Sequence, residues 1–267
     1  MRQSLLLITA ALVWISVATP APAQDDVPAP IVLPAPTETG GGGDSGSITL
    51  SLVSSKPNEI VDEDRWWERN GLEKPEVYVR FPALTRGKVP EVAPANYRGL
   101  PLMAVWNSSG RRFFVYGEEI YKARYLLATS PEGGRIEFAF DAAAYGNAAW
   151  AALVDGILYL TNNPGNLSAA DGGGARLFAI DVETNRLKWA SAEKTCSGQF
   201  LAIAGSIVCA YGFTGEPDFI FVLDRFTGEV TQKLKLKTAA NWLIPKDGRL
   251  HVRCYNTDDV YRIDIRD

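Results

Sequence analysis

Residues 176–191, RLFAIDVETNRLKWAS, contain the pattern that decides the fold of this chain. The stretch reads as a strand, a tight turn that begins at Asp181, and a second strand that ends near Trp189. An Asp at such a corner accepts hydrogen bonds from backbone N–H groups two or three residues further on, and Asn185 tolerates the left-handed backbone that a tight hairpin needs. We therefore expect a β-hairpin over these residues.

The same hairpin pattern recurs three more times. Asp224 and Asp264 occupy the corner in two further copies, and residues 124–140 carry a weaker copy with Thr129 at that position. The four corners are 52, 43 and 40 residues apart. Spacing of this size indicates a repeat of one supersecondary unit.

A second recurring pattern precedes the hairpins. An aromatic-bearing strand, an Asp-Gly turn and another strand follow one another from Trp150 and again, at the same spacing, from Trp242, and Phe200 begins a variant with Gly-Ser. Each unit therefore holds four short strands, which is typical of a β-propeller blade. The sequence predicts an all-β protein: a small β-propeller of four to five four-stranded antiparallel blades, with its repeats in residues 102–267.

The hairpin also carries a family resemblance. Residues 179–189, A-x-D-x-x-T-N-x-x-x-W, resemble the tryptophan-docking repeat of quinoprotein-like propellers (pyrroloquinoline-quinone-type repeats), in which Gly usually stands at position 185. Residues 222–232 keep the Asp, Thr and Gly of that pattern but lack the Trp. The resemblance covers about residues 105–267 and implies the propeller architecture. It implies no cofactor, because the chain is short for such a ring and has no adjacent cysteines.

The first 47 residues are expected to lie outside the propeller. Residues 1–23 combine a basic Arg2, an apolar run and a small-residue cleavage site, which together predict a secretory signal peptide rather than a membrane anchor. No Cys lies near that site, so we expect a periplasmic or secreted protein without a lipid anchor and without a transmembrane segment in the mature chain. Residues 24–47 are rich in Pro, Ala and Gly and read as a linker or as a plain N-terminal tail.

Residues 48–101 form an N-terminal extension that can supply a closing strand, a short helix or a degenerate fifth blade. Residues 47–53 and 76–81 are strand candidates, and residues 58–72 are expected to contain one short helix. The last repeat lacks its fourth strand, which would leave an open sheet edge. We therefore expect residues 47–53 or 76–81 to pair beside Val260–Ile265 and close the ring.

Composition argues against several classes of function. The chain carries 27 Lys and Arg against 31 Asp and Glu, without a block of like charge, so it has no electrostatic reason to bind nucleic acid or an anionic bilayer. The single histidine, His251, is expected to pack on a strand and not to bind a metal or serve in a triad. Cys196, Cys209 and Cys254 are expected to be buried thiols, with a disulfide from Cys196 as the alternative.

The loops that follow the second strands open on one face of the expected ring. Long loops on a rigid ring often carry function, although Asn and Asp are also the residues that turns need. The candidate binding residues on this loop face are Asn162, Asn163, Asn166, Asp171, Glu216, Asp218, Asn256 and Asp258. The recurring tryptophans are expected to pack between blades, whereas Trp66 and Trp67 are candidates for an interface, with core packing as the alternative.

These observations favour a function without catalysis. We expect a protein-binding or scaffold module that engages a protein partner in an envelope or extracellular assembly. A carbohydrate-binding protein or glycoside-active enzyme is the first alternative, and an enzyme of that kind would need two converging loop carboxylates beside exposed aromatic rings. A quinoprotein-like oxidoreductase remnant is the second alternative.

Overall fold

The computed structural model describes residues 27–36, 47–59, 63–80, 85–90, 92–119, 122–163, 174–212 and 216–266. The expected signal peptide lies outside these ranges, as do Asn166 and Asp171 of the candidate loop face. Within the ranges, no helix is long and apolar enough to cross a membrane.

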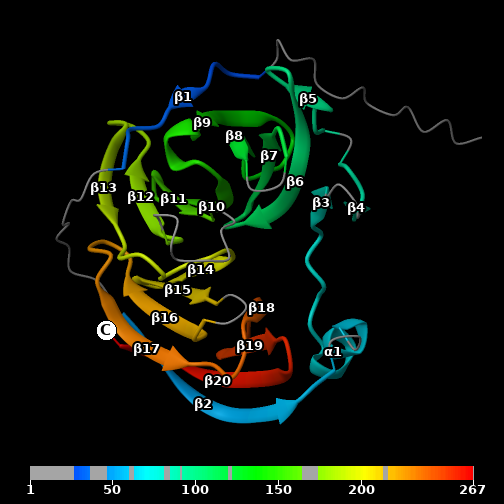
Figure 1. The fold of residues 1–267 in the computed structure, drawn as a ribbon, viewed down its shortest axis with the longest axis vertical. Coiled ribbons are helices and arrows are strands. Elements are labelled where there is room, and N and C mark those ends of the chain that lie inside the picture. Colours follow the sequence, from blue (N-terminus) through cyan, green and yellow to red (C-terminus); the bar gives the residue numbers. More distant parts are fainter. Residues whose placement is uncertain are drawn as a thin grey trace, which may run out of the picture.

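Four antiparallel sheets follow one another along an arc (Figure 1). Blade 1 contains β6 (Leu100–Ser108), β7 (Arg111–Gly117), β8 (Ala123–Thr129) and β9 (Ile136–Asp141), and blade 2 contains β10 (Ala148–Val154), β11 (Ile157–Asn162), β12 (Leu177–Asp181) and β13 (Arg186–Ala190). Blade 3 contains β14 (Phe200–Ile203), β15 (Ser206–Tyr211), β16 (Phe219–Asp224) and β17 (Val230–Lys235), and blade 4 contains β18 (Ala240–Lys246), β19 (Arg249–Cys254), β20 (Thr257–Arg266) and β2 (Ser47–Pro57). The predicted all-β propeller is confirmed, and the described residues form four blades.

Strand β2 completes blade 4, as the open edge of the last repeat requires. It pairs antiparallel with β20, with Ile48 opposite Ile265 and Leu50 opposite Ile263. Ile48 and Leu50 are 2% exposed and pack against blade 3, and this burial selects the register, because a slip of one residue would turn both side chains to the other face. The expected pairing of residues 47–53 beside Val260–Ile265 is therefore confirmed.

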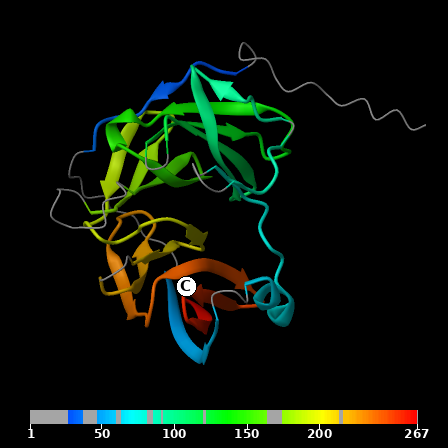
Figure 2. The same cartoon turned by 45° about the vertical axis from the view of Figure 1, so that its right-hand side comes forward.

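The rest of the N-terminal extension lies between blade 4 and blade 1 (Figure 2). Helix α1 (Glu63–Asn70) ends before Gly71, which has a φ of +58°, and it lies beside blade 4. Strand β3 (Tyr78–Arg80), the other candidate for closure, pairs with β6 of blade 1 and with β4 (Thr85–Arg86). The short strand β5 (Asn96–Tyr97) also pairs with β6. The extension thus adds strands to blade 1 and a helix to blade 4, and its described residues form no fifth blade.

Hydrophobic clusters join consecutive blades. Trp106 and Phe178 belong to the cluster between blades 1 and 2, Trp189 and Phe200 to the cluster between blades 2 and 3, and Leu250 to the cluster between blades 3 and 4. Over the described ranges, blades 4 and 1 share no such cluster, and separate parts of the extension pack on each.

Asp181 and Asp224 form the predicted corner turns, whereas the other two predicted corners differ. The Asp181 carboxylate accepts the backbone N–H of Thr184 at 2.8 Å, and the Asp224 carboxylate accepts that of Thr227 at 2.8 Å. In blade 1 the corner is Ser130 instead of Thr129, because the Ser130 N–H donates to the Arg135 carbonyl at 2.9 Å, just as the Asp224 N–H donates to the Glu229 carbonyl at 2.8 Å. Asp264 lies within β20, opposite Thr49, and not at a turn.

The tryptophan-docking pattern has a direct structural counterpart. The Trp189 indole N–H donates to the Arg225 carbonyl in the turn of the next blade at 3.0 Å. In that turn Gly228 has a φ of +76°, and a Cβ atom added to it would lie 2.6 Å from the Trp189 ring. Gly228 is therefore required both by its backbone conformation and by the ring that covers it.

Two other outer-strand residues stand at the position of Trp189. Trp189 pairs with Ala179, Phe138 pairs with Ala128 in blade 1, and Gln232 pairs with Val222 in blade 3. In each case the partner lies two positions before the corner. The Gln232 side chain accepts the N–H of Leu50 and donates to its carbonyl, both at 2.8 Å, and so joins β17 to the closing strand.

Part of the stretch expected to be a linker is built into the fold. Strand β1 (Ile31–Val32) pairs in parallel with β9, with Ile31 opposite Phe140. Leu33 is 4% exposed and belongs to the cluster between blades 1 and 2.

The three cysteines are buried free thiols, as expected. Cys196 and Cys209 belong to the same cluster, and burial followed by the interaction with Cys196 raises the pKa of the Cys209 thiol. Burial also raises the pKa of Cys254 to about 12. The Cys209 and Cys254 side chains therefore stay protonated near neutral pH.

Candidate functional site: an α1–β2 cleft and a β14–β18 pocket

Two concave sites lie next to helix α1. The α1–β2 cleft has a volume of about 1050 Å³ and lies between the helix and the ends of β2 and β20. The β14–β18 pocket has a volume of about 400 Å³ and lies where the first strands of blades 3 and 4 begin. Glu63 of the helix lines the pocket, whereas its later residues Asp64, Arg65, Arg69 and Asn70 line the cleft.

The α1–β2 cleft carries charges of both signs. Its basic side chains are Lys56, Arg65 and Arg69, and its acidic ones are Glu59, Asp64 and Asp258. The lining has no aromatic ring and no single dominant charge. Such a surface suits the polar side chains and main chain of a protein partner better than a strongly charged ligand.

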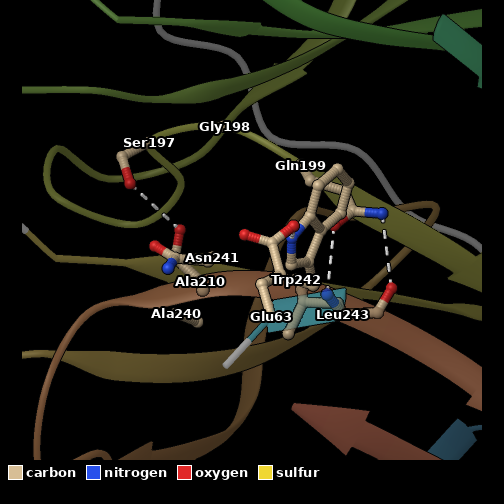
Figure 3. A pocket seen from close by; sticks show the side chains of 9 residues that line it. All are labelled: Glu63, Ser197, Gly198, Gln199, Ala210, Ala240, Asn241, Trp242 and Leu243. Atoms are coloured by element: carbon tan, nitrogen blue, oxygen red, sulfur yellow. Dashed lines mark hydrogen bonds between the residues drawn. The ribbon is translucent and has the colours of Figure 1, made fainter. Parts of the chain in front are cut away.

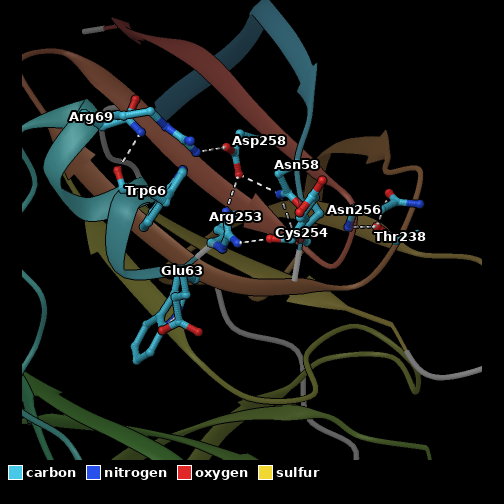
Figure 4. Close-up of polar contacts among 12 residues, drawn as sticks. Asn58, Glu63, Trp66, Arg69, Thr238, Arg253, Cys254, Asn256 and Asp258 are labelled. Atoms are coloured by element: carbon cyan, nitrogen blue, oxygen red, sulfur yellow. Dashed lines mark hydrogen bonds and ion pairs between the residues drawn. The ribbon is translucent and has the colours of Figure 1, made fainter. Parts of the chain in front are cut away.

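A buried ion pair holds the wall of the cleft in place (Figure 4). The Arg253 side chain is 1% exposed and donates to Asp258 Oδ1 at 2.9 Å and to the Glu59 carbonyl at 2.8 Å. Asn58 Nδ2 donates to the same Asp258 oxygen at 2.7 Å, and Arg69 reaches its other oxygen at 3.5 Å. Because a buried guanidinium must keep its partners, these contacts fix β19, β20, the end of β2 and α1 relative to one another.

The outer edge of β2 is hydrogen-bonded to blade 3 near its start and unpaired further on, within the described residues. Near its start, Ser206 accepts the N–H of Ile48 at 3.1 Å and Gln232 binds the backbone of Leu50. Further on, Leu52 and Val53 are 59% and 53% exposed, and no strand pairs with this edge within the described residues. Pro57, which has no N–H, ends the strand. The open part of the edge is therefore short and leads into the cleft.

The β14–β18 pocket combines one carboxylate with one tryptophan (Figure 3). The half-buried Trp242 indole N–H donates to Glu63 Oε1 at 3.0 Å. The Gln199 amide binds both the N–H and the carbonyl of Leu243, at 3.0 and 3.3 Å, and so joins blade 3 to blade 4. Ser197 and Asn241 complete the polar lining. A second carboxylate is absent from this lining, so the pocket lacks the pair that glycoside hydrolysis uses.

The predicted loop residues of blade 2 bind backbone groups. Asn162 Oδ1 accepts the N–H of Arg176 at 2.8 Å, and Asn163 Nδ2 donates to the Ser197 carbonyl at 2.9 Å. These contacts hold the loop and the connection to blade 3 in position. Neither residue lines one of the two concave sites.

The predicted acids of blade 3 are also separate from both sites. Glu216 forms an ion pair with Lys194 at 2.7 Å and accepts the Tyr211 hydroxyl, and the bond from Lys194, followed by that from Tyr211, lowers its pKa. Burial raises the pKa of Asp218, whose Oδ1 atom is buried without a hydrogen-bond partner. Neither carboxylate lines the α1–β2 cleft or the β14–β18 pocket.

The predicted residues of blade 4 lie at the β19–β20 turn. Asn256 is exposed and accepts the Thr238 hydroxyl at 2.8 Å. Asp258 lies in β20 and lines the α1–β2 cleft, the only one of the described candidates to line either concave site.

Trp66 and Trp67 are buried, at 1% and 4% exposure. Their rings lie 4.6 Å apart in an edge-on arrangement, and Trp67 packs against Trp242 at 5.4 Å. Both rings thus belong to the internal contact between α1 and blade 4.

Sequence reasoning missed the basic residues of the cleft. Arg65 and Arg69 are four residues apart in a predicted helix, so they share a helix face, which was the available signal. For Arg253, in the middle of a predicted strand, the sequence offers no comparable signal.

The solved structures that resemble this chain do so at low sequence identity and low TM-score. No protein-family model matches the chain, and no curated protein matches it. Among solved structures, a europium-containing methanol dehydrogenase is 14% identical over 49% of this chain and 24% of its own length, with a TM-score of 0.33. BamB from Moraxella catarrhalis is 11% identical over 67% of this chain and 62% of its own length, with a TM-score of 0.31.

The β-propeller domain of the Trilobed protease from Pyrococcus furiosus, described as having an open velcro topology, is 9% identical. The match covers 60% of this chain and 52% of that domain, with a TM-score of 0.35. This chain thus spans about a quarter of the methanol dehydrogenase and less than two thirds of BamB. The strand pairing establishes that the described residues of this chain form a small β-propeller of four blades.

Proposed function

We propose that this chain is an exported protein-binding module that engages its partner through the α1–β2 cleft and the adjoining open edge of β2. The observation that carries the proposal is the exposure of Leu52 and Val53 on an outer strand whose edge, at that point, pairs with no strand of the described part of the chain. Natural proteins usually protect such an edge, and an exposed apolar edge beside a cleft is where an extended segment of another protein can add as a strand.

The surroundings of the edge fit a protein partner. The segment after β2 is fixed to Asp258 and Arg253, so the surface is formed in the free protein and needs little ordering on binding. The mixed charges of the cleft can pair with polar side chains of an added strand. The signal-peptide pattern of residues 1–23 supports the export that we propose, and with it a partner in the envelope or outside the cell.

The test is an affinity pull-down from the native envelope fraction with the mature, tagged protein, followed by mass spectrometry. Val53→Glu places a charge on the open edge of β2, and Val230→Glu places the same charge on a valine that is 45% exposed in β17 of blade 3. We expect the unaltered protein and Val230→Glu to retain one stoichiometric partner and Val53→Glu to lose it. Recovery of the protein alone, or equal recovery with both variants, would contradict the proposal.

The β14–β18 pocket supports a second candidate, a lectin-like carbohydrate binder. A half-buried Trp242 beside Glu63, Asn241 and Gln199 offers a ring face and polar groups to a sugar. Titration of a glycan panel with tryptophan fluorescence as the readout tests this candidate. Binding that is lost in Asn241→Ala would support it, and the absence of any response would count against it.

A further inference from the structure

Residues 27–36, here called the arm, lie across the junction between blades 1 and 2. Figure 1 shows β1 running along β9 at the outer side of blade 1 and leading toward β13. The arm carries the sequence VPAPIVLPAP, which has no charged residue and four prolines. It is bound by residues from both blades, and the sequence separation from its anchors exceeds 60 residues.

The arm is held mainly through its backbone. Leu33 N–H donates to the Asp141 carbonyl at 3.0 Å, the Tyr145 hydroxyl donates to the Pro34 carbonyl at 2.8 Å, and Asn185 Nδ2 donates to the Val32 carbonyl at 2.9 Å. These partners recognise the main chain of an extended segment whatever its side chains are. The prolines favour the extended backbone that such recognition needs.

Two arm side chains pack against the apolar cluster between blades 1 and 2. Leu33 is 4% exposed and belongs to the cluster of Phe140, Tyr145 and Phe178. Ile31 is half-buried against the same cluster, whereas Val32 between them is 67% exposed. The groove therefore selects an apolar residue at two alternate positions of a strand and leaves the middle one free.

The junction that holds the arm differs from the next one because blade 1 has no docking tryptophan. Phe138 stands where Trp189 stands in blade 2, and a phenyl ring has no N–H to give to the turn of the next blade. Gly228 is covered by Trp189, whereas the corresponding Asn185 has a φ of +51° and uses its side chain to bind the arm. The turn that holds the arm thus binds it through the Asn185 side chain, whereas the turn of the next blade is covered by an indole.

We propose that this groove is a peptide-binding site for an extended, uncharged segment of the Ile-x-Leu-Pro type in another protein, and that the arm is its intramolecular competitor. The arm adds only two residues of strand to blade 1, so its local release costs little compared with unfolding a blade. A tethered competitor lowers the apparent affinity for a segment from outside, and the affinity rises when the competitor is weakened.

The test uses a fluorescent synthetic peptide of residues 27–36 as the probe and anisotropy as the readout. Leu33→Asp in the full chain weakens the tethered arm and leaves the groove intact. Val32→Asp is the matched control, because that side chain points away from the groove. We expect the Leu33→Asp chain to bind the probe at least roughly tenfold more tightly than the unaltered chain and Val32→Asp to bind as the unaltered chain does. A probe that itself carries Asp at the Leu33 position should not bind.

Equal probe binding by all three chains, or no binding by a folded Leu33→Asp chain, would overturn the proposal. A second measurement needs no variant: hydrogen exchange at Leu33 of the unaltered chain should accelerate as unlabelled probe is added, and unchanged protection at saturating probe would overturn it as well. A concentration-dependent dimer that the probe dissociates would assign the groove to the arm of a second copy instead of another protein.

Discussion

The junction between blades 2 and 3 and the junction between blades 1 and 2 differ at one equivalent position. At the first, Trp189 covers Gly228 and donates to the Arg225 carbonyl. At the second, Phe138 has no donor, and the N-terminal arm packs there and is bound by Asn185. The strand register determines which outer-strand position contacts the next blade. The residue type at that position depends on the chemical groups that the next blade presents there.

The junction between blades 3 and 4 extends the comparison. There the neighbour is the closing strand β2, which offers a backbone N–H and a carbonyl, and Gln232 binds both at Leu50. An indole, a phenyl ring and an amide thus occupy one repeat position. The repeat is therefore preserved in geometry more than in residue type, which explains why only blade 2 matches the family pattern closely.

Replacing the docking ring should have the largest effect. Trp189→Ala removes a ring that is 1% exposed together with its hydrogen bond, and we expect a loss of about 3–5 kcal/mol in the free energy of unfolding. Phe138→Ala should cost less, because Phe138 is only partly buried. Urea denaturation of the two variants measures the difference, and equal losses would show that the two junctions do not differ as described.

The turn beneath the ring comes next. Gly228→Ala places a Cβ atom 2.6 Å from Trp189 at a φ of +76°, so we expect a loss of about 2–4 kcal/mol. Asn185→Gly keeps the turn conformation and removes only the contact with the arm, for which we expect a change of about 1 kcal/mol or less. Thermal unfolding of both variants gives the comparison, and a larger loss for Asn185→Gly would reverse the roles assigned to the two turns.

A smaller effect is expected at the closing strand. Gln232→Ala removes two hydrogen bonds to Leu50, which should cost about 1–2 kcal/mol. Lys235→Ala, at an exposed position of the same strand, serves as the control and should change stability little. If the two variants unfold at the same denaturant concentration, the amide does not join blades 3 and 4.

The smallest effect is expected at Asp141, which ends β9 beside the arm. The hydrogen bond from Arg124 is the main cause that lowers the pKa of Asp141 below its ordinary value of 3.8. A lowered pKa means that the stabilisation is complete above 3.8 and is lost as the pH falls through the folded-state value.

Asp141→Asn should therefore reduce stability by about 1 kcal/mol or less near neutral pH, since Arg124 is half exposed. The difference from the unaltered chain should shrink in strong acid. Denaturation of both proteins from neutral pH to strong acid measures this difference in stability. A difference that grows on acidification would contradict the stabilising role given to the ionised Asp141.

The predictable parts of this molecule are those that depend on local spacing. The corners at Asp181 and Asp224 follow from turn chemistry, and the missing strand of blade 4 indicates that β2 must complete it. The turn of blade 1 was predicted to begin at Thr129 but begins at Ser130. Blade 1 has no aspartate to mark its corner, and the alternation of apolar and polar residues alone does not fix the position of the turn to one residue.

The candidate sites could not be predicted in the same way. Arg69 meets Asp258 across 189 residues, and Trp67 meets Trp242 across a similar separation. The hydrogen-bonding capacity of Asn162 and Asn163 was visible in the sequence, but the backbone groups that use it were not. Contacts of this kind form only when distant parts of the chain come together in the folded protein. They produce no periodic pattern in the sequence.

The pairing of β2 with β20 also has a kinetic consequence. It joins residues 47–57 to residues 257–266, so blade 4 depends on contacts of the highest sequence separation in the chain. Because loop closure must precede such pairing, blade 4 should be the last to form and the first to open, while blades 1 to 3 can assemble from neighbouring segments. During synthesis, Ile48 on β2 has no partner strand until β20, the last strand of the chain, is available. Until β2 and β20 pair, their exposed apolar residues and unpaired edges can bind chaperones or aggregate.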